Sequence, residues 1–156
     1  MFFIKCLVDG KIEILAKIDI DSLFDFMSKK LIDELGVPYR ETCDYVKSLF
    51  KNAIGEKGCI GTALYYKGEY RHLCYSDAYE FIILDSDKPP YGPKYDLVLG
   101  QGWLWAHRAK IDMYRGNLII DNCHIPLISE EKNFGFSDAS SESESESESE
   151  SEPNTP

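Results

Sequence analysis

The sequence predicts an all-β domain with one or two short helices. Two observations lead to this fold class. Runs rich in β-branched and aromatic residues recur along the 156-residue chain, and glycine-containing turns separate them. The hydrophobic fraction of 44% suits a packed core. A chain of this length buries about two-thirds of the surface that its unfolded form exposes, so it needs no disulfides to fold.

The first half of the chain opens with a predicted hairpin and a helix. In residues 2–20, FFIKCLVDGKIEILAKIDI, two apolar runs flank Asp9-Gly10, a dipeptide that accepts the positive φ angles of a tight turn. The stretch SKKLIDELG then reads as a short helix. Ser28 is its expected N-cap and Gly36 its left-handed C-terminal residue.

The middle of the chain predicts further strands. Residues 61–75, GTALYYKGEYRHLCY, form the best second hairpin, with a turn at Lys67-Gly68. The run YEFIIL, residues 79–84, reads as a buried strand. Residues 85–95 hold three prolines and a glycine, which indicates a loop.

The last structured part, residues 95–128, predicts a strand, a corner at Leu99-Gly100, a short tryptophan-rich helix and two more strands. Two corners of the chain therefore look alike. KIDIDS and LVLGQG each end an apolar strand and lead toward a helix. The first corner carries the closely spaced carboxylates of Asp19 and Asp21.

Charge is unevenly distributed. The net charge is −10, but Asp138 and six glutamates lie after Ser137 without any Lys or Arg. Without those seven acids, 20 Asp and Glu face 17 Lys and Arg, so we expect no direct nucleic-acid ligand. We predict a domain at residues 1–130 and a disordered acidic tail at residues 131–156.

The alternating Ser-Glu run suggests two specific functional hypotheses for the tail. Each serine of the alternating run from Ser141 to Ser149 has a glutamate three residues later, which suits kinases that recognise acidic sequences. The tail is also suited to docking on a basic partner.

Five scattered cysteines without a CxxC pair favour reduced thiols. No run of about 18 apolar residues appears, and the first residues do not look like a signal peptide. We therefore expect a soluble intracellular protein, cytoplasmic or nuclear, with no membrane partner.

With these motifs in view, the chain resembles the retropepsin-like aspartic proteases of retroviruses and retrotransposons. The resemblance covers about residues 2–128 and includes KIDIDS, FMSKKLIDELG, LVLGQGWL and AKIDMYRGNLII. It implies a closed β-barrel with a flap hairpin, a homodimer, and an origin from a retroelement. When Asp19 is placed on the family's catalytic aspartate, Phe26 and Ser28 fall on the start of the helix without a gap.

The resemblance also implies a chemistry. Two aspartates, one from each subunit, share a proton; the ionised one activates water and the other polarises the scissile carbonyl. Asp19 would be that residue, acting on extended peptides or proteins. Substrate contacts would come from Ile20, Ser22 and a flap turn at Lys67-Gly68, and Leu99-Gly100 would be a structural corner.

Two departures favour an impaired enzyme. The family's Thr or Ser after the aspartate is Ile20 here, and the next glycine is Asp21. The first change removes a hydroxyl that orients the dyad, and the second adds a side chain and a charge. We therefore predict either an impaired endopeptidase or a non-catalytic module that binds peptides or dimerises. Asp21 is a weaker candidate for the reacting acid.

We expect neither a metal nor a cofactor. His72-x-Cys74 and the adjacent Cys123-His124 match no common zinc spacing, and Cys59 does not complete one. A Cys–His nucleophile pair has equally thin support.

Overall fold

The computed structural model describes residues 1–58, 60–73, 80–90 and 95–129. Its strands are β1 (Phe2–Val8), β2 (Ile12–Ile18), β3 (Asp25–Ser28), β4 (Ala53–Gly58), β5 (Thr62–Tyr66), β6 (Glu69–His72), β7 (Glu80–Leu84), β8 (Leu97–Leu99), β9 (Lys110–Asp112), β10 (Asn117–Ile120), β11 (Cys123–Pro126) and β12 (Ile128–Ser129). Its helices are α1 (Lys29–Leu35), α2 (Asp44–Leu49) and α3 (Gln101–Ala106). The predicted tail lies outside the described residues. No helix in the described ranges is long and apolar enough to cross a membrane.

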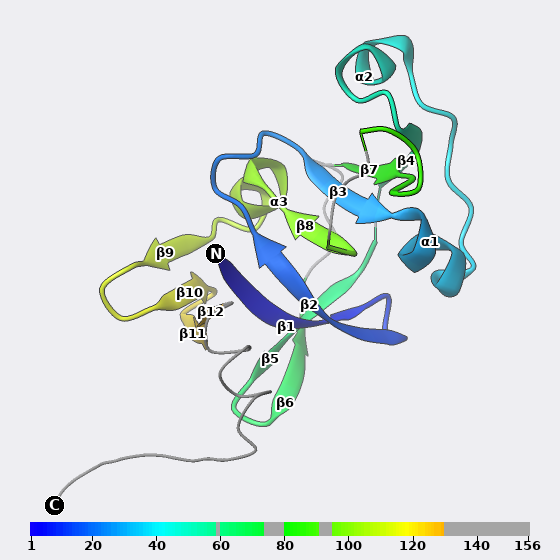
Figure 1. Ribbon diagram of the computed structural model, residues 1–156. Coiled ribbons are helices and arrows are strands. Elements are labelled where there is room, and N and C mark those ends of the chain that lie inside the picture. The colour runs from blue at the N-terminus through cyan, green and yellow to red at the C-terminus, as the bar shows by residue number, and fades with distance from the viewer. Residues whose placement is uncertain (59, 74–79, 91–94, 130–156) are drawn as a thin grey trace, which may run out of the picture.

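Most strands join one nine-stranded sheet. Its order is β4-β7-β3-β8-β2-β1-β5-β6, and β12 pairs with β1 beside this path (Figure 1). A separate three-stranded sheet has the order β11-β10-β9. The predicted all-β class is confirmed. The predicted closure is corrected, because the strands at the two ends of the path, β4 and β6, do not pair within the described residues.

Both predicted hairpins form. β1 pairs with β2 along their full length, and the turn residues Asp9 and Gly10 have φ angles of 53° and 67°. β5 pairs with β6, with φ angles of 50° at Lys67 and 86° at Gly68. Both dipeptides therefore adopt a left-handed turn conformation, which Gly and Asp tolerate well and which Lys67 also adopts.

The helix α1 begins and ends where the sequence indicates. The Leu31 amide donates to the Ser28 hydroxyl at 3.0 Å, and Gly36 ends the helix with φ 68°. The strand β3 just before it was not predicted as a separate element, and neither was α2. α2 lacks a side-chain cap on its N-terminus and buries only Val46, so the sequence carries little signal for it.

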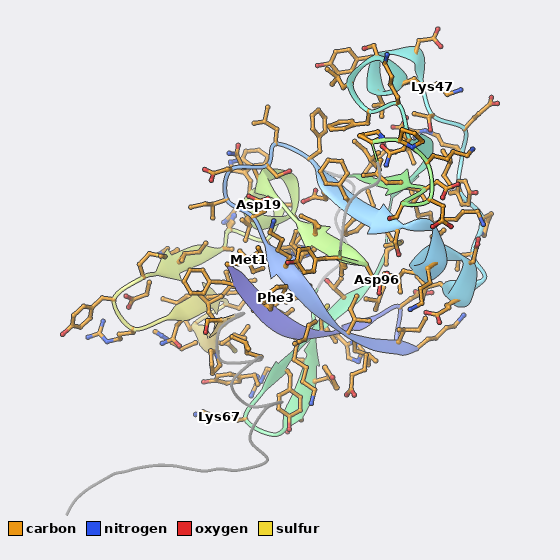
Figure 2. All side chains as sticks on the ribbon, in the orientation of Figure 1. Met1, Phe3, Asp19, Lys47, Lys67 and Asp96 are labelled. Atoms are coloured by element: carbon orange, nitrogen blue, oxygen red, sulfur yellow. The ribbon has the colours of Figure 1, made fainter. Side chains whose placement is uncertain are left out.

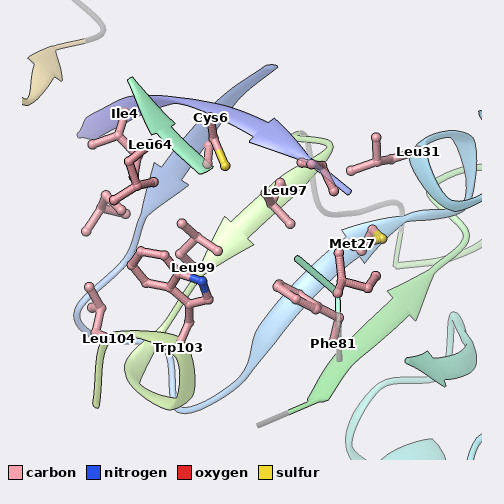
Figure 3. Close-up of a cluster of buried hydrophobic side chains, with 14 of the residues drawn as sticks. Ile4, Cys6, Met27, Leu31, Leu64, Phe81, Leu97, Leu99, Trp103 and Leu104 are labelled. Atoms are coloured by element: carbon pink, nitrogen blue, oxygen red, sulfur yellow. The ribbon is translucent and has the colours of Figure 1, made fainter. Parts of the chain in front are cut away.

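The main core lies on the inner face of the large sheet. Its largest fully buried side chains include Trp103 from α3 and Phe81 from β7, packed with aliphatic residues of β1, β3 and β8 (Figure 3). A smaller cluster around Val46, Ile82 and Phe50 fastens α2 to β7. The core thus fixes α3 and β8 together with β2, the strand that leads to Asp19.

Candidate functional site

The two corners that look alike in the sequence lie side by side. β2 and β8 run parallel, with Ile18 opposite Leu99. The Asp19 amide donates to the Leu99 carbonyl at 3.0 Å, so this pairing continues one residue beyond β2. The structure therefore brings Asp19 against Leu99 and Gly100.

Gly100 is required by close packing. A Cβ atom built on it would lie 2.3 Å from the Phe24 carbonyl oxygen and 2.7 Å from that of Ser22. The Gln101 amide donates to this same Ser22 carbonyl at 2.8 Å. The loop after Asp19 is therefore tied by its backbone to the corner before α3.

Asp25 completes this tie, and sequence reasoning missed it. Its side chain is buried, and one carboxylate oxygen accepts the Gly100 amide at 2.6 Å and the Trp103 amide at 3.1 Å. Burial raises the pKa of Asp25 to about 6, while the bonds from Trp103 and Gly100 act in the opposite direction. The available signal was an acid in DFMS with Met27, a core residue, two positions later on the same strand face.

The Asp19 carboxylate is itself occupied. One oxygen accepts the Asp21 amide at 3.1 Å, and the other lies 3.4 Å from the Lys17 ammonium. Lys17 also lies over the ring of Tyr95, 5.5 Å from its centroid. Neither partner was predicted, although residues 17 and 19 of an extended strand share a face.

The residues after Asp19 face solvent to different degrees. Ile20 is 53% exposed and Asp21 is also exposed. The Ser22 hydroxyl donates to the Phe24 carbonyl at 2.7 Å and is thus used inside the loop. Of these three candidates, Ile20 and Asp21 are the ones left at the surface.

A cavity of about 800 Å³ lies beside this loop. Ile20 forms one part of its lining, and the rest comes from Ala109 and from α3 and the residues just after it, including Leu104, Trp105 and Arg108. Trp105 is 79% exposed and Leu23, nearby in the chain, is 68% exposed. The site therefore combines a carboxylate loop with an apolar surface open to solvent.

The turn at Lys67-Gly68 does not join this site. β1 and β5 separate β6 from β2 in the sheet, and Figure 2 places Lys67 well away from Asp19. No residue of the β5–β6 hairpin is among the residues lining the cavity beside Ile20. The described residues also hold no group of three His, Cys, Asp or Glu side chains placed to bind a metal.

The chain therefore offers Asp19, engaged by Lys17 and by its own loop, and exposed Asp21. Acid–base catalysis by a shared proton needs two carboxylates close together and free to reach water and a carbonyl. The described residues of one chain do not supply such a free pair. Asp25, the third acid near the corner, is committed to the start of α3.

Comparisons with known proteins identify the fold. No family model matches the sequence, and no curated protein matches it. Among solved structures, the retroviral protease-like domain of Ddi1 from Leishmania major is similar, with a TM-score of 0.58 and 19% sequence identity. The match covers 84% of this chain and 96% of that domain. The chain thus has a retropepsin-like fold.

Proposed function

We propose that this chain, with its retropepsin-like fold, is a catalytically impaired homologue of the aspartic endopeptidases that binds extended peptide segments. We further propose that it acts as a homodimer and derives from a retroelement. The observation that carries the proposal is the engaged state of Asp19, both of whose carboxylate oxygens have partners.

The position of Asp19 supports descent from an enzyme. It follows β2 directly and is bonded to Leu99 at the corner before α3. In an enzyme of this family the catalytic aspartate would follow that strand. The resemblance in sequence and this position in the fold support Asp19, rather than Asp21 or Asp25, as the residue that corresponds to the reacting acid.

The surroundings of Asp19 oppose hydrolysis. To activate a water, the carboxylate would have to release Lys17 and the Asp21 amide. In a homodimer joined at this loop, Asp19 and Asp21 of both copies would meet. At about 6 Å and an effective dielectric of about 20, each added pair of like charges costs roughly 3 kcal/mol when both are ionised. Proton uptake would relieve that repulsion but would disturb the one-proton state of the dyad.

Peptide cleavage tests the proposal directly. A peptide library is incubated at pH 4 to 7 with four proteins. They are the wild type, Asp19→Asn, the double variant Ile20→Thr with Asp21→Gly, and that double variant combined with Lys17→Leu. We expect no cleavage by the wild type, because the Asp19 carboxylate is engaged. We expect none by Asp19→Asn, because that variant lacks the carboxylate. The double variant, combined with Lys17→Leu, should gain activity with an acidic optimum.

Peptide binding distinguishes a non-catalytic binding module from a protein that neither cleaves nor binds peptides. Wild type and Asp19→Asn should retain the same peptides with similar affinity in a pull-down of the library, because the proposed binding does not require catalysis by Asp19. Sedimentation velocity on the same samples measures whether a dimer forms. Retention of no peptide by either protein would contradict the binding role.

The alternative is an active endopeptidase with an unusual motif. The bond between Asp19 and Leu99, which holds the acid at the corner, favours this alternative. Wild-type cleavage that disappears in Asp19→Asn would establish it and overturn the impaired state.

A further inference from the structure

A second cavity, of about 140 Å³, lies between two hairpins that belong to different sheets. The β5–β6 hairpin contributes Leu64, Tyr66 and Arg71 to its lining, and the β10–β11 hairpin contributes Ile120 and Cys123. β11 packs against β5, so the large and the small sheet meet here (Figure 1). The loop after β2 takes no part in this region, because β1 lies between β5 and β2.

The strand register explains why these side chains converge. Leu64 lies opposite Arg71 across the β5–β6 pair, and Tyr66 lies two residues further along β5. Ile120 lies opposite Cys123 in the β10–β11 pair. Opposite residues of an antiparallel pair, and residues two apart in one strand, point to the same face of a sheet. Each hairpin therefore turns one face toward the cavity.

The inner part of the cavity is apolar. Leu64, Ile120 and Ile125 are almost fully buried, and half-buried Leu73 and Cys123 also line it. An apolar cavity of about 150 Å³ with such walls holds a molecule of the size of benzene. The inner part therefore suits one branched aliphatic or aromatic side chain.

Two exposed residues of the lining carry opposite charges. Arg71 is exposed on β6, and Asp121 is exposed in the turn between β10 and β11. They form no ion pair with each other or with any other group in the described part of the chain. His72 also lines the cavity, but its register opposite Ala63 directs its side chain to the other face. A cation and an anion at one opening select a ligand that carries both charges.

The ring of Tyr66 positions the cation. The guanidinium carbon of Arg71 lies 5.2 Å from the ring centroid, within the range of a cation–π contact. A guanidinium held in this way still offers N–H donors that can bind a carboxylate in pairs. Lys67, over the same ring at 5.3 Å, and Glu69, opposite Tyr66, lie outside the lining and carry opposite charges.

We propose that the cavity between the two hairpins binds a free α-amino acid with an apolar side chain of the size of leucine or phenylalanine. The side chain occupies the inner part against Leu64, Ile120 and Ile125. The carboxylate of the ligand binds the Arg71 guanidinium, and its ammonium group binds the Asp121 carboxylate. This site goes beyond the proposed peptide binding and does not depend on it, because the two sites use different elements.

The thiol of Cys123 makes occupancy measurable in the full-length protein, since Cys123 lines the cavity and is half-buried. Labelling by iodoacetamide is followed by peptide mapping, with exposed Cys43 at the start of α2 as the internal control. The probes are leucine, phenylalanine, N-acetylleucine and leucinamide. We expect leucine and phenylalanine to slow the labelling of Cys123 alone. The other two probes each lack one charge and should bind about tenfold more weakly or worse.

Two variants assign the charges. Arg71→Gln should lose the preference for leucine over leucinamide, because the carboxylate no longer has a partner. Asp121→Asn should lose the preference for leucine over N-acetylleucine. Asn tolerates the φ of 50° at this position, so the turn is retained. Lys30→Gln, at an exposed position of α1, is the matched control and should change neither preference.

Titration calorimetry with the same probes repeats the comparison without labelling. Absence of both heat and Cys123 protection with leucine and phenylalanine would overturn the proposal. Heat without protection would place the ligand elsewhere and would also overturn it. Equal binding of all four probes by the wild type, or a preference retained in the variant that should lose it, would mean that the two charges do not recognise the ligand.

Discussion

At the residue scale, the three aspartates near the Leu99-Gly100 corner have different roles because their environments differ. Asp25 is buried and holds two backbone amides of the corner, whereas Asp19 is half-buried beside Lys17. Asp21 faces solvent and contributes its backbone rather than its side chain to the loop. Three aspartates within seven residues thus serve as a cap, an ion-pair partner and a solvated charge.

Asp25 gives the protein an unusual pH dependence. Its pKa of about 6 in the folded state exceeds the ordinary value of 3.8, so between these pH values the native state binds the proton more tightly than the unfolded state. The contribution of Asp25 to the free energy of unfolding is therefore greatest below about pH 4 and falls as pH rises through 6. The whole effect is about 3 kcal/mol.

Urea denaturation at pH 4, 5, 6 and 7 measures this effect. Asp25→Asn keeps an acceptor for both amides but does not titrate, so the difference in stability between wild type and variant should change with pH in that window. A pH-independent difference for Asp25→Asn would contradict the assigned pKa.

At the element scale, the corner before α3 depends on backbone contact. The carbonyls of Phe24 and Ser22 that surround Gly100 cannot rotate away as a flexible side chain would. We expect Gly100→Ala to lower the free energy of unfolding by about 3 kcal/mol, through overpacking. Thermal denaturation followed by circular dichroism measures the loss.

Gly10→Ala is the matched control for this change. Gly10 has a positive φ of 67° but no atom within 4 Å of an added Cβ. That variant should lose about 1 kcal/mol from backbone strain alone. A Gly100→Ala variant as stable as Gly10→Ala would mean that the corner adjusts and that contact is not the reason for the glycine.

The same elements show how much of the fold could be predicted from the sequence. The two hairpins and α1 follow from local signals, namely Asp9-Gly10, Lys67-Gly68 and the Ser28 cap, and all three form. α2 and β3 lack such signals, since α2 has no side-chain cap and β3 gains its order from pairing with β7 and β8. The prediction of a closed barrel was wrong because closure depends on pairing between strands that lie far apart in the chain, which local signals do not specify.

The site was predictable in position but not in detail. KIDIDS and LVLGQG indicated the two corners, and the structure brings them together. The Lys17–Asp19 contact and the reach of Asp25 to α3 depend on tertiary packing, so the sequence alone did not reveal them. Lys67 and Gly68 were assigned to this site because the resemblance made their hairpin the flap. The hairpin pattern itself does not determine where a hairpin lies in the sheet.

At the scale of the whole molecule, β1 is the central connection. It pairs with β2 along one edge and with both β5 and β12 along the other. Cys6 lies in this strand, fully buried, and burial raises its pKa to about 12. Its thiol should therefore become reactive only when the whole sheet opens.

Thiol labelling of the native protein tests this expectation. Cys43 is exposed at the start of α2, so it should react with a maleimide without unfolding. Cys6 should react at a rate limited by global unfolding, and urea should accelerate it in step with the loss of circular dichroism signal. Peptide mapping by mass spectrometry assigns each labelled site. Labelling of Cys6 as fast as Cys43 would mean that β1 opens locally.

The pairing of β1 with β12 has a consequence for the order in which the protein is made. Phe2 and Phe3 leave the ribosome before their partners Ser129 and Ile128. Until then, part of one edge of β1 presents unpaired backbone groups to its surroundings. Nascent chains are thus exposed to mispairing until Ile128 and Ser129 have been made, and chaperones that shield strand edges would act in that interval.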